Sequence, residues 1–197
     1  MLKSKKQIFF IFLIVPFLSA ISQQRRSAGQ ATTELIYLLS HMGPRLDLNY
    51  LIQLPALLSD GANPNVRDQY GNTTLLILSR LDATNLLAKI LLQHDTNPNL
   101  SDLAGNSPLL WATKNNNKEL VNLLIVKKAN PNLTNADGIS PLMIATDNGN
   151  LEIVQMLLNN GADPHMKDNK GASAFDIARK KNFGPIIKLL SEKIKLP

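Results

Sequence analysis

Residues 135–167 read NADGISPLMIATDNGNLEIVQMLLNNGADPHMK and predict two short helices with a polar break between them. Ser140 and Pro141 predict the start of the first helix, because a serine hydroxyl can cap the first turn and proline fits the first helical position. Apolar residues recur at helical spacing from Leu151 to Leu158 and predict the second helix. The stretch therefore predicts a turn followed by two helices.

The proline and the turn glycine of this stretch recur at a regular period along most of the chain. Prolines that follow Asn or Asp are spaced by 34, 33 and 33 residues, and a glycine follows each of them by seven residues. An Asp or Asn stands three residues before each of these glycines. The prolines are Pro64, Pro98, Pro131 and Pro164, and the turn pairs are Asp68 and Gly71, Asp102 and Gly105, Asn135 and Gly138, and Asp168 and Gly171. Because the prolines and the turn pairs share one period, they predict an internal repeat.

This unit resembles the ankyrin repeat, both in Gly-x-Ser-Pro-Leu at residues 138–142 and in Leu-Leu-x-x-Gly-Ala-Asp-Pro at residues 157–164. The resemblance implies an all-α solenoid of stacked helix-turn-helix units joined by β-turn or hairpin loops. It covers residues 34–197, with degenerate caps at about 34–67 and 168–197 and central units at 68–101, 102–134 and 135–167. Within the first unit, Pro55 either begins a short helix or kinks a longer one.

The chain departs from the family's usual Thr-Pro-Leu-His sequence, because the histidine is missing from every unit. In its place stand Leu76, Leu110, Met143 and Asp176. In the family this imidazole hydrogen-bonds between turns, so the Leu and Met replacements predict an apolar packing solution. The departure leaves open how hydrogen bonds would join one repeat to the next.

The first 22 residues, Met1 to Ser22, are predicted to be a secretory signal peptide. A short basic start precedes eleven mostly apolar residues, about half of the ~20 that a membrane-spanning helix needs. Ala20 and Ser22 are the small residues expected before a cut after Ser22. This pattern predicts export, to a bacterial periplasm or out of the cell, with residues 23–33 as a linker to the repeats.

The alternative for the leader is a retained hydrophobic anchor over residues 8–21. Arg25 and Arg26 follow the expected cut closely, which fits an uncleaved helix as well. In that case the chain would be a membrane-anchored structural or envelope protein.

The composition excludes several classes of protein. The 197-residue chain has no cysteine, which rules out a disulfide-stapled scaffold, a zinc ribbon and thiol catalysis. His41, His94 and His165 lie in different units without metal-site spacing, so we expect no metal and no cofactor. Beyond the leader, 18 basic residues (21 less the three lysines of the leader) face 15 acidic ones, a net charge of +3.

A stacked array predicts a binding module rather than an enzyme. Each unit exposes an apolar face that only a neighbour can cover, so an elongated stack forms. Its turn tips and first helices build a concave face, but the shape lacks the closed, dry pocket in which catalytic charges are held. We expect a monomer that binds a protein through this concave face, with no nucleic acid and no membrane insertion after leader removal.

The residues expected on the concave face come from the turns and the first helices. From the turns they are Gln69, Tyr70, Asn72, Leu103, Ala104, Asn106, Ala136, Asp137, Ile139, Asn169, Lys170 and Ala172. From the first helices they are Trp111, Lys114, Asn115, Asp147 and Asn148. Tyr70 and Trp111 carry the most weight, because large aromatic side chains are enriched at binding hot spots. Trp111 also fits a second interpretation, packing between repeats.

A basic tail offers another binding hypothesis. It comprises Arg179, Lys180, Lys181, Lys188, Lys193 and Lys195, which would suit phosphate or an anionic membrane surface. The alternative is a solvated outer face of the terminal cap. Apolar residues between Ile186 and Leu190 favour this alternative, because they would cover the last repeat.

Overall fold

The computed structural model describes residues 26–40, 48–81 and 85–194, which contain ten helices. The predicted leader, Met1 to Ser22, lies outside the described residues, so its processing stays a prediction. None of the helices in the described part of the chain combines the length and the apolar character needed to cross a bilayer.

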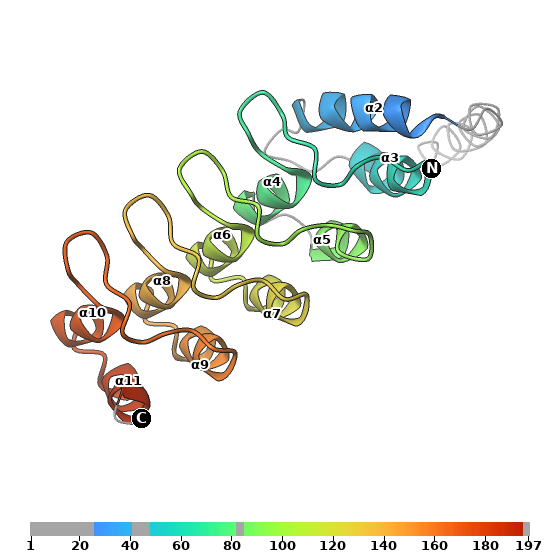
Figure 1. The fold of residues 1–197 in the computed structure, drawn as a ribbon. Helices are drawn as coiled ribbons and strands as arrows, with labels where there is room; N and C mark the ends of the chain where they lie inside the picture. Colours follow the sequence, from blue (N-terminus) through green and yellow to red (C-terminus); the bar gives the residue numbers. More distant parts are fainter. Residues whose placement is uncertain (1–25, 41–47, 82–84, 195–197) are drawn as a thin grey trace, which may run out of the picture.

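The helices come in pairs that stack one after another (Figure 1). In chain order the pairs are α2 (Ala28–Ser40) and α3 (Leu48–Ser59), α4 (Thr74–Arg80) and α5 (Asn85–Leu91), α6 (Pro108–Lys114) and α7 (Lys118–Val126), α8 (Pro141–Asp147) and α9 (Leu151–Asn159), and α10 (Ala174–Lys180) and α11 (Gly184–Ile194). Helices α4, α6, α8 and α10 form one row, and α3, α5, α7, α9 and α11 form the other. The predicted all-α solenoid is confirmed.

Each first helix from α4 to α10 begins at a hydroxyl cap. Ser107 Oγ accepts from Leu110 N at 3.2 Å and Ser140 Oγ accepts from Met143 N at 3.3 Å, as predicted for the two Ser-Pro starts. The capping residues are extended, with ψ of 164° at Ser107 and 162° at Ser140, which is the conformation that a following proline requires. Thr73 and Ser173 cap α4 and α10 in the same way.

The apolar faces of both rows meet in one continuous core. Leu109 and Leu142 are fully buried in the first row, and Leu124 and Leu157 in the second. Burying such a side chain stabilises the fold by about 1.5–3 kcal/mol relative to exposure. Since no single helix pair can bury both of its faces, the stack itself is the unit of stability.

The positions where the family has histidine are apolar and buried in three units. Leu76, Leu110 and Met143 have almost no exposed surface, so the predicted apolar packing solution is confirmed. Asp176 takes the position in the last unit, where its carboxylate accepts from the Ser173 N–H at 2.9 Å and completes a capping box.

Hydrogen bonds between repeats come instead from a ladder of asparagines. Asn65 Oδ1 accepts from the Asn97 N–H, Asn99 Oδ1 from Asn130 and Asn132 Oδ1 from Asp163, at 2.7, 2.7 and 2.8 Å. Each rung joins the loop of one unit to the equivalent loop of the next. The Asn-Pro-Asn period therefore marks the joints as well as the turns.

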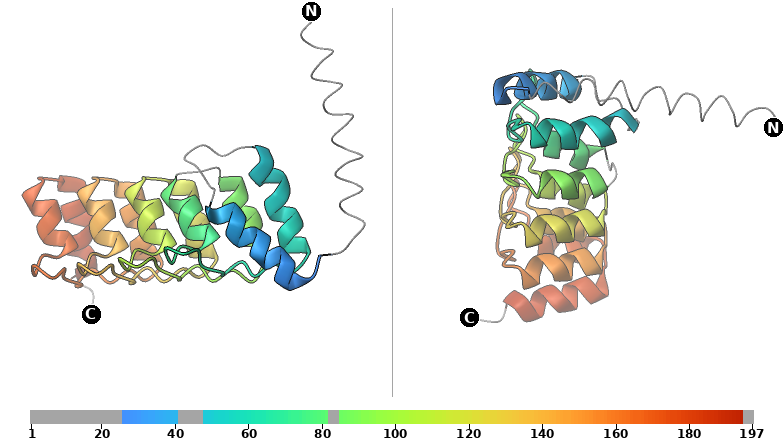
Figure 2. Two further views of the ribbon diagram at one scale, coloured as in Figure 1. Left: turned by 90° about the horizontal axis from the view of Figure 1, so that it is seen from above. Right: turned by 90° about the vertical axis from the view of Figure 1, so that its right-hand side faces the viewer.

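Helix α2 lies across the N-terminal end of the stack rather than parallel to the other first helices (Figures 1 and 2). It begins at Ala28, so the predicted linker over 23–33 is wrong from that residue onward. Ala31 and Leu35 are fully buried in the hydrophobic core, which gives this segment a packing energy that a linker lacks. Within α3, Pro55 lies inside the helix and does not begin one.

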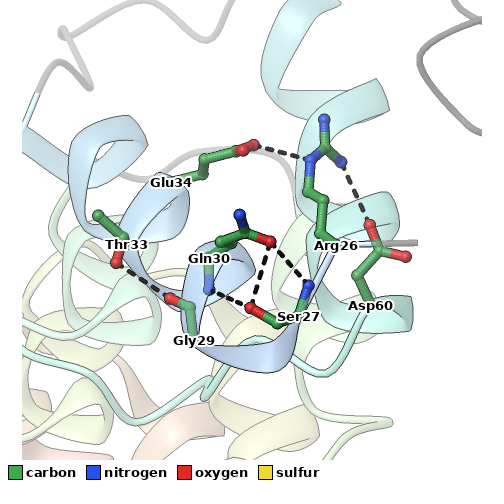
Figure 3. A network of polar contacts seen from close by, with 7 residues as sticks. All are labelled: Arg26, Ser27, Gly29, Gln30, Thr33, Glu34 and Asp60. Carbon is green, nitrogen blue, oxygen red and sulfur yellow. Dashed lines mark hydrogen bonds and ion pairs between the residues drawn. The ribbon is translucent and has the colours of Figure 1, made fainter. Parts of the chain in front are cut away.

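Polar contacts fix the start of α2 (Figure 3). Ser27 and Gln30 form a reciprocal cap, in which Gln30 Oε1 accepts from Ser27 N at 3.0 Å and Ser27 Oγ accepts from Gln30 N at 3.3 Å. The Arg26 guanidinium pairs with Glu34 at 3.1 Å and with Asp60, at the end of α3, at 3.2 Å. Arg26 therefore ties the first described residues to the loop that follows α3.

Candidate partner-binding surface

The residue three places before each turn glycine holds its turn closed. Asp102 Oδ1 accepts from the backbone N–H of Ala104 at 3.0 Å and of Asn106 at 2.9 Å. Asp68, Asn135 and Asp168 accept from the equivalent pairs in their own turns. Because one oxygen fixes two N–H groups, the backbone of each tip has a defined shape without a partner present.

Neighbouring tips are joined through their backbones in the C-terminal half. Ala136 N donates to Ala104 O at 2.9 Å, and Asn169 N donates to Asp137 O at 3.0 Å. Gly138 has φ of +75°, and a Cβ there would lie 3.0 Å from Asn169 N. Only glycine suits this position, both for its conformation and for the close approach of the next tip.

The side chains at the tips point outward from this fixed backbone. Leu103 is 85% exposed and Tyr70 is 63% exposed, which is unusual for large apolar side chains. We name as the tip row the eight predicted residues that the structure leaves exposed there. They are Gln69, Tyr70, Leu103, Ala104, Ala136, Asp137, Asn169 and Lys170.

Other predicted turn residues belong to the turn itself. Asn72 is only 7% exposed, and its Nδ2 donates to both carboxylate oxygens of Asp68, so its prediction as a surface residue is wrong. Asn106 makes the same contacts with Asp102 and is half-buried. Ile139 and Ala172 are half-buried as well.

Trp111 connects the tips to the first-helix row. Its Nε1 donates to Asp102 Oδ2 at 3.1 Å, and the Lys114 ammonium lies 4.8 Å from the centroid of its ring. The ring is half-buried, so it packs within its own unit and keeps part of its surface available. Such a cation–π contact contributes about 0.5–1 kcal/mol at an exposed site.

The C-terminal ends of the first helices are tied to one another. Asn115 Nδ2 donates to Ser79 O at 3.0 Å and to Arg80 O at 3.1 Å, and Asn148 Nδ2 donates to Thr113 O at 3.1 Å. These two asparagines, predicted as contact residues, thus join adjacent units. We name as the helix-end row the exposed last residues of the four first helices α4, α6, α8 and α10, which are Arg80, Lys114, Asp147 and Lys180.

An open cleft lies apart from the tip row. Within 26–40, 48–81 and 85–194, no three of His, Asp or Glu gather as metal ligands would. An open cleft of about 490 Å³ lies between the loops after α3 and α5, and its lining includes Gly61, Asn63, His94 and Asp95. None of the predicted contact residues lines this cleft.

A family model described as ankyrin repeats in three copies matches residues 47–135 and 111–196. Together these matches span three quarters of the chain, with turns, helix caps and paired helices in the order the family requires. The chain belongs to the ankyrin repeat family. No curated protein matches it. Ankyrin repeats are generally modules for protein–protein interaction, and ankyrin repeat proteins are typically scaffolds without catalysis.

Proposed function

We propose that this ankyrin array binds a partner protein through its concave face, which the tip row and the helix-end row border. The observation that supports this most is that exposed side chains stand on a backbone already fixed by turn hydrogen bonds. A pre-ordered surface loses little conformational entropy on binding, so more of the contact energy becomes affinity.

The aromatic and aliphatic side chains of two neighbouring units support the same proposal. Tyr70 and Leu103 are largely exposed on adjacent tips, and Trp111 stands behind them with part of its ring available. Hot spots of protein interfaces are enriched in tyrosine and tryptophan. We expect these side chains to supply most of the binding energy.

A combined substitution tests the proposal. The changes Tyr70→Ala, Leu103→Ala, Asp137→Ala and Lys170→Ala should abolish capture of the partner that the unaltered protein enriches from envelope and host extracts. The circular dichroism spectrum and thermal midpoint should stay nearly unchanged, because these side chains lie outside the core. A matched control makes four changes on the second-helix row, which are Leu86→Ala, Val126→Ala, Lys127→Ala and Glu192→Ala.

Two outcomes would contradict the concave face. Binding that survives the combined change but is lost after removal of residues from Lys188 onward would move recognition to the basic tail. Equal loss with the control set would show that the measured binding does not depend on either surface in particular.

We also propose that the array is exported with removal of its leader. The support is the sequence of residues 1–22 alone. Intact-mass measurement of the exported protein should show a chain that lacks these 22 residues. A mature species that still begins at Met1 would instead favour the membrane-anchored structural protein.

A further inference from the structure

We propose that the partner presents an acidic amphipathic segment, which binds over the two units that contain α4 and α6. This inference rests on the proposed function and specifies the chemistry of what the concave face recognises. Three observations support it: the exposed basic side chains of these two units, the exposed apolar side chains on their tips, and the contacts of Trp111 that connect the two.

The acidic residues of these two turns are engaged within the turns. Asp68 accepts from two backbone N–H groups and from the Asn72 amide. Asp102 accepts from two backbone N–H groups and from the Trp111 indole. Both carboxylates face donors of their own turn, so they are poorly placed to pair with cations of a partner or of the rows.

The basic residues of the same units are exposed. Arg80 and Lys114 are exposed in the helix-end row, and Arg67 is exposed beside the tips, where its guanidinium donates to Gly71 O and to Ser101 O at 2.8 Å. No described acidic side chain pairs with Arg67, Arg80 or Lys114. The net charge of +3 over residues 23–197 therefore conceals a locally basic face.

The C-terminal units differ in this respect. Asp147, which holds the helix-end position in α8, pairs with Lys181 at 2.6 Å, and Asp137 adds an exposed carboxylate to the tip row. Among the described residues of the two rows, the units of α4 and α6 carry only positive charge, whereas the C-terminal units carry Asp137 and Asp147 beside Lys170 and Lys180. Charge complementarity favours an acidic partner at this part of the face.

Apolar side chains on the tips lie next to one of these basic residues. A Cβ at Gly71 would lie 3.2 Å from Leu103 Cδ2 and 3.9 Å from Arg67 Nη1, so an exposed leucine and a guanidinium share one place on the tips. Tyr70 adjoins them on the same turn. A bound segment has the highest affinity if one of its apolar side chains contacts Tyr70 and Leu103 and an acidic side chain pairs with Arg67.

The geometry sets the two chemistries side by side. The contacts from Asp102 to Trp111 and from Trp111 to Lys114 place the tip row and the helix-end row on one surface. Helix α6, which has seven residues and is about 10 Å long, separates the turn that holds Leu103 from the helix end at Lys114. A segment with apolar residues along one edge and acidic residues along the other matches both rows.

Selection from a phage-displayed random peptide library on the immobilised mature protein tests this inference. Selected peptides should be acidic and amphipathic, and their affinity, measured by fluorescence anisotropy, should fall as salt rises. Lys114→Glu and Leu103→Asp should each weaken binding by about tenfold or more. The matched variants Lys127→Glu and Val126→Asp, on the other helix row, should leave affinity unchanged, with all four folds checked by circular dichroism.

The outcomes separate this inference from the proposed function. Neutral or basic peptides that still depend on Leu103 would overturn the acidic segment and leave the concave face in place. Peptides sensitive only to Val126→Asp or Lys127→Glu would overturn both, and a selection without enrichment would overturn the acidic segment. Flotation with phosphatidylglycerol vesicles that depends on Lys114, without acidic peptides, would replace the protein segment by a membrane surface.

Discussion

The joint at the N-terminal end of the stack is built differently from the central joints. Between the central units, each loop bonds to the next through an asparagine such as Asn132, whose Oδ1 accepts from Asp163 N and whose Nδ2 donates to Gly161 O at 2.9 Å. At the N-terminal end the acceptor is Thr32 Oγ1 of α2, which takes the N–H of Asn63 at 3.0 Å. Thr32 thus takes the place that an asparagine holds in the other rungs of the ladder.

The first helix after this joint differs in the same way. Leu78 in α4 holds the position that Ala112, Ala145 and Ala178 hold in the following first helices, and all four are buried. Small residues allow the parallel first helices to approach closely. Helix α2 lies across the end of the stack instead of parallel to α4 (Figure 2), and the buried residue at this position of α4 is the larger leucine. The N-terminal joint therefore depends on individual side chains, whereas the central joints depend on residues that recur in each repeat.

Truncation of the core should have the largest effect on stability. Leu78→Ala should lower the free energy of unfolding by about 2–5 kcal/mol, because it leaves a cavity at a position where the other units need none. Leu157→Ala, in the central stack, should fall in the same range. Denaturant titration measures both, with Lys114→Ala as an exposed control. Small and equal effects at all three positions would contradict the assigned register.

Removal of a ladder contact should cost less and should differ between the two kinds of joint. Asn132→Ala removes two inter-repeat hydrogen bonds and should destabilise by about 1–3 kcal/mol. Thr32→Val removes one inter-repeat bond and the bond that Thr32 Oγ1 donates to Ala28 O within the exposed face of α2, and should cost about 0.5–1.5 kcal/mol. Hydrogen exchange should show faster opening of α2 only in Thr32→Val. Faster exchange spread over the whole chain in that variant would mean that the N-terminal joint is not separable.

Thr74→Pro should stabilise the protein by about 0.4–1 kcal/mol. Thr74 stands where α6 and α8 have Pro108 and Pro141, and the preceding Thr73 already has the extended ψ of 164° that proline requires. The change also removes a buried Oγ1 that finds no hydrogen-bond partner among the described residues. The thermal midpoint gives the result. A lower midpoint would show that the start of α4 is not equivalent to those of α6 and α8.

The smallest effect concerns the capping box of the last unit. Hydrogen bonds from the Ser173 side chain and backbone lower the pKa of Asp176 in the folded state. A lowered folded pKa means that this stabilisation is complete above the ordinary aspartate pKa of about 3.9 and is lost as pH falls through the folded value. The stability difference between the unaltered protein and Asp176→Ala should therefore be constant near neutral pH and shrink below about pH 4. A difference that persists into acid would exclude the carboxylate as its source.

Sequence reasoning predicted the regular units because their signals are local and repeated. Ser107-Pro108 and Ser140-Pro141 each fix a helix start within two residues, and the structure has both. Helix α2 was missed because it has no copy elsewhere in the chain. Its one local signal was the Ser27-x-x-Gln30 capping box, which the structure forms.

The contact surface was harder to predict than the fold. Exposure at a turn depends on whether a neighbouring carboxylate captures the side chain, as Asp68 captures the Asn72 amide, and spacing alone does not reveal this. The asparagine ladder was visible as a repeated Asn-Pro-Asn sequence. Its role as a joint was not, because a side chain that bonds across to the next unit has no signature in its own repeat.

Site-specific photo-crosslinking tests most directly whether recognition uses the concave face. A photoreactive phenylalanine analogue placed at Leu103 lies on the tip row, and the same analogue at Val126, which is also exposed, lies on the second-helix row. We expect the partner to be covalently trapped from position 103 and not from position 126. Trapping from position 126 without trapping from position 103 would contradict this expectation.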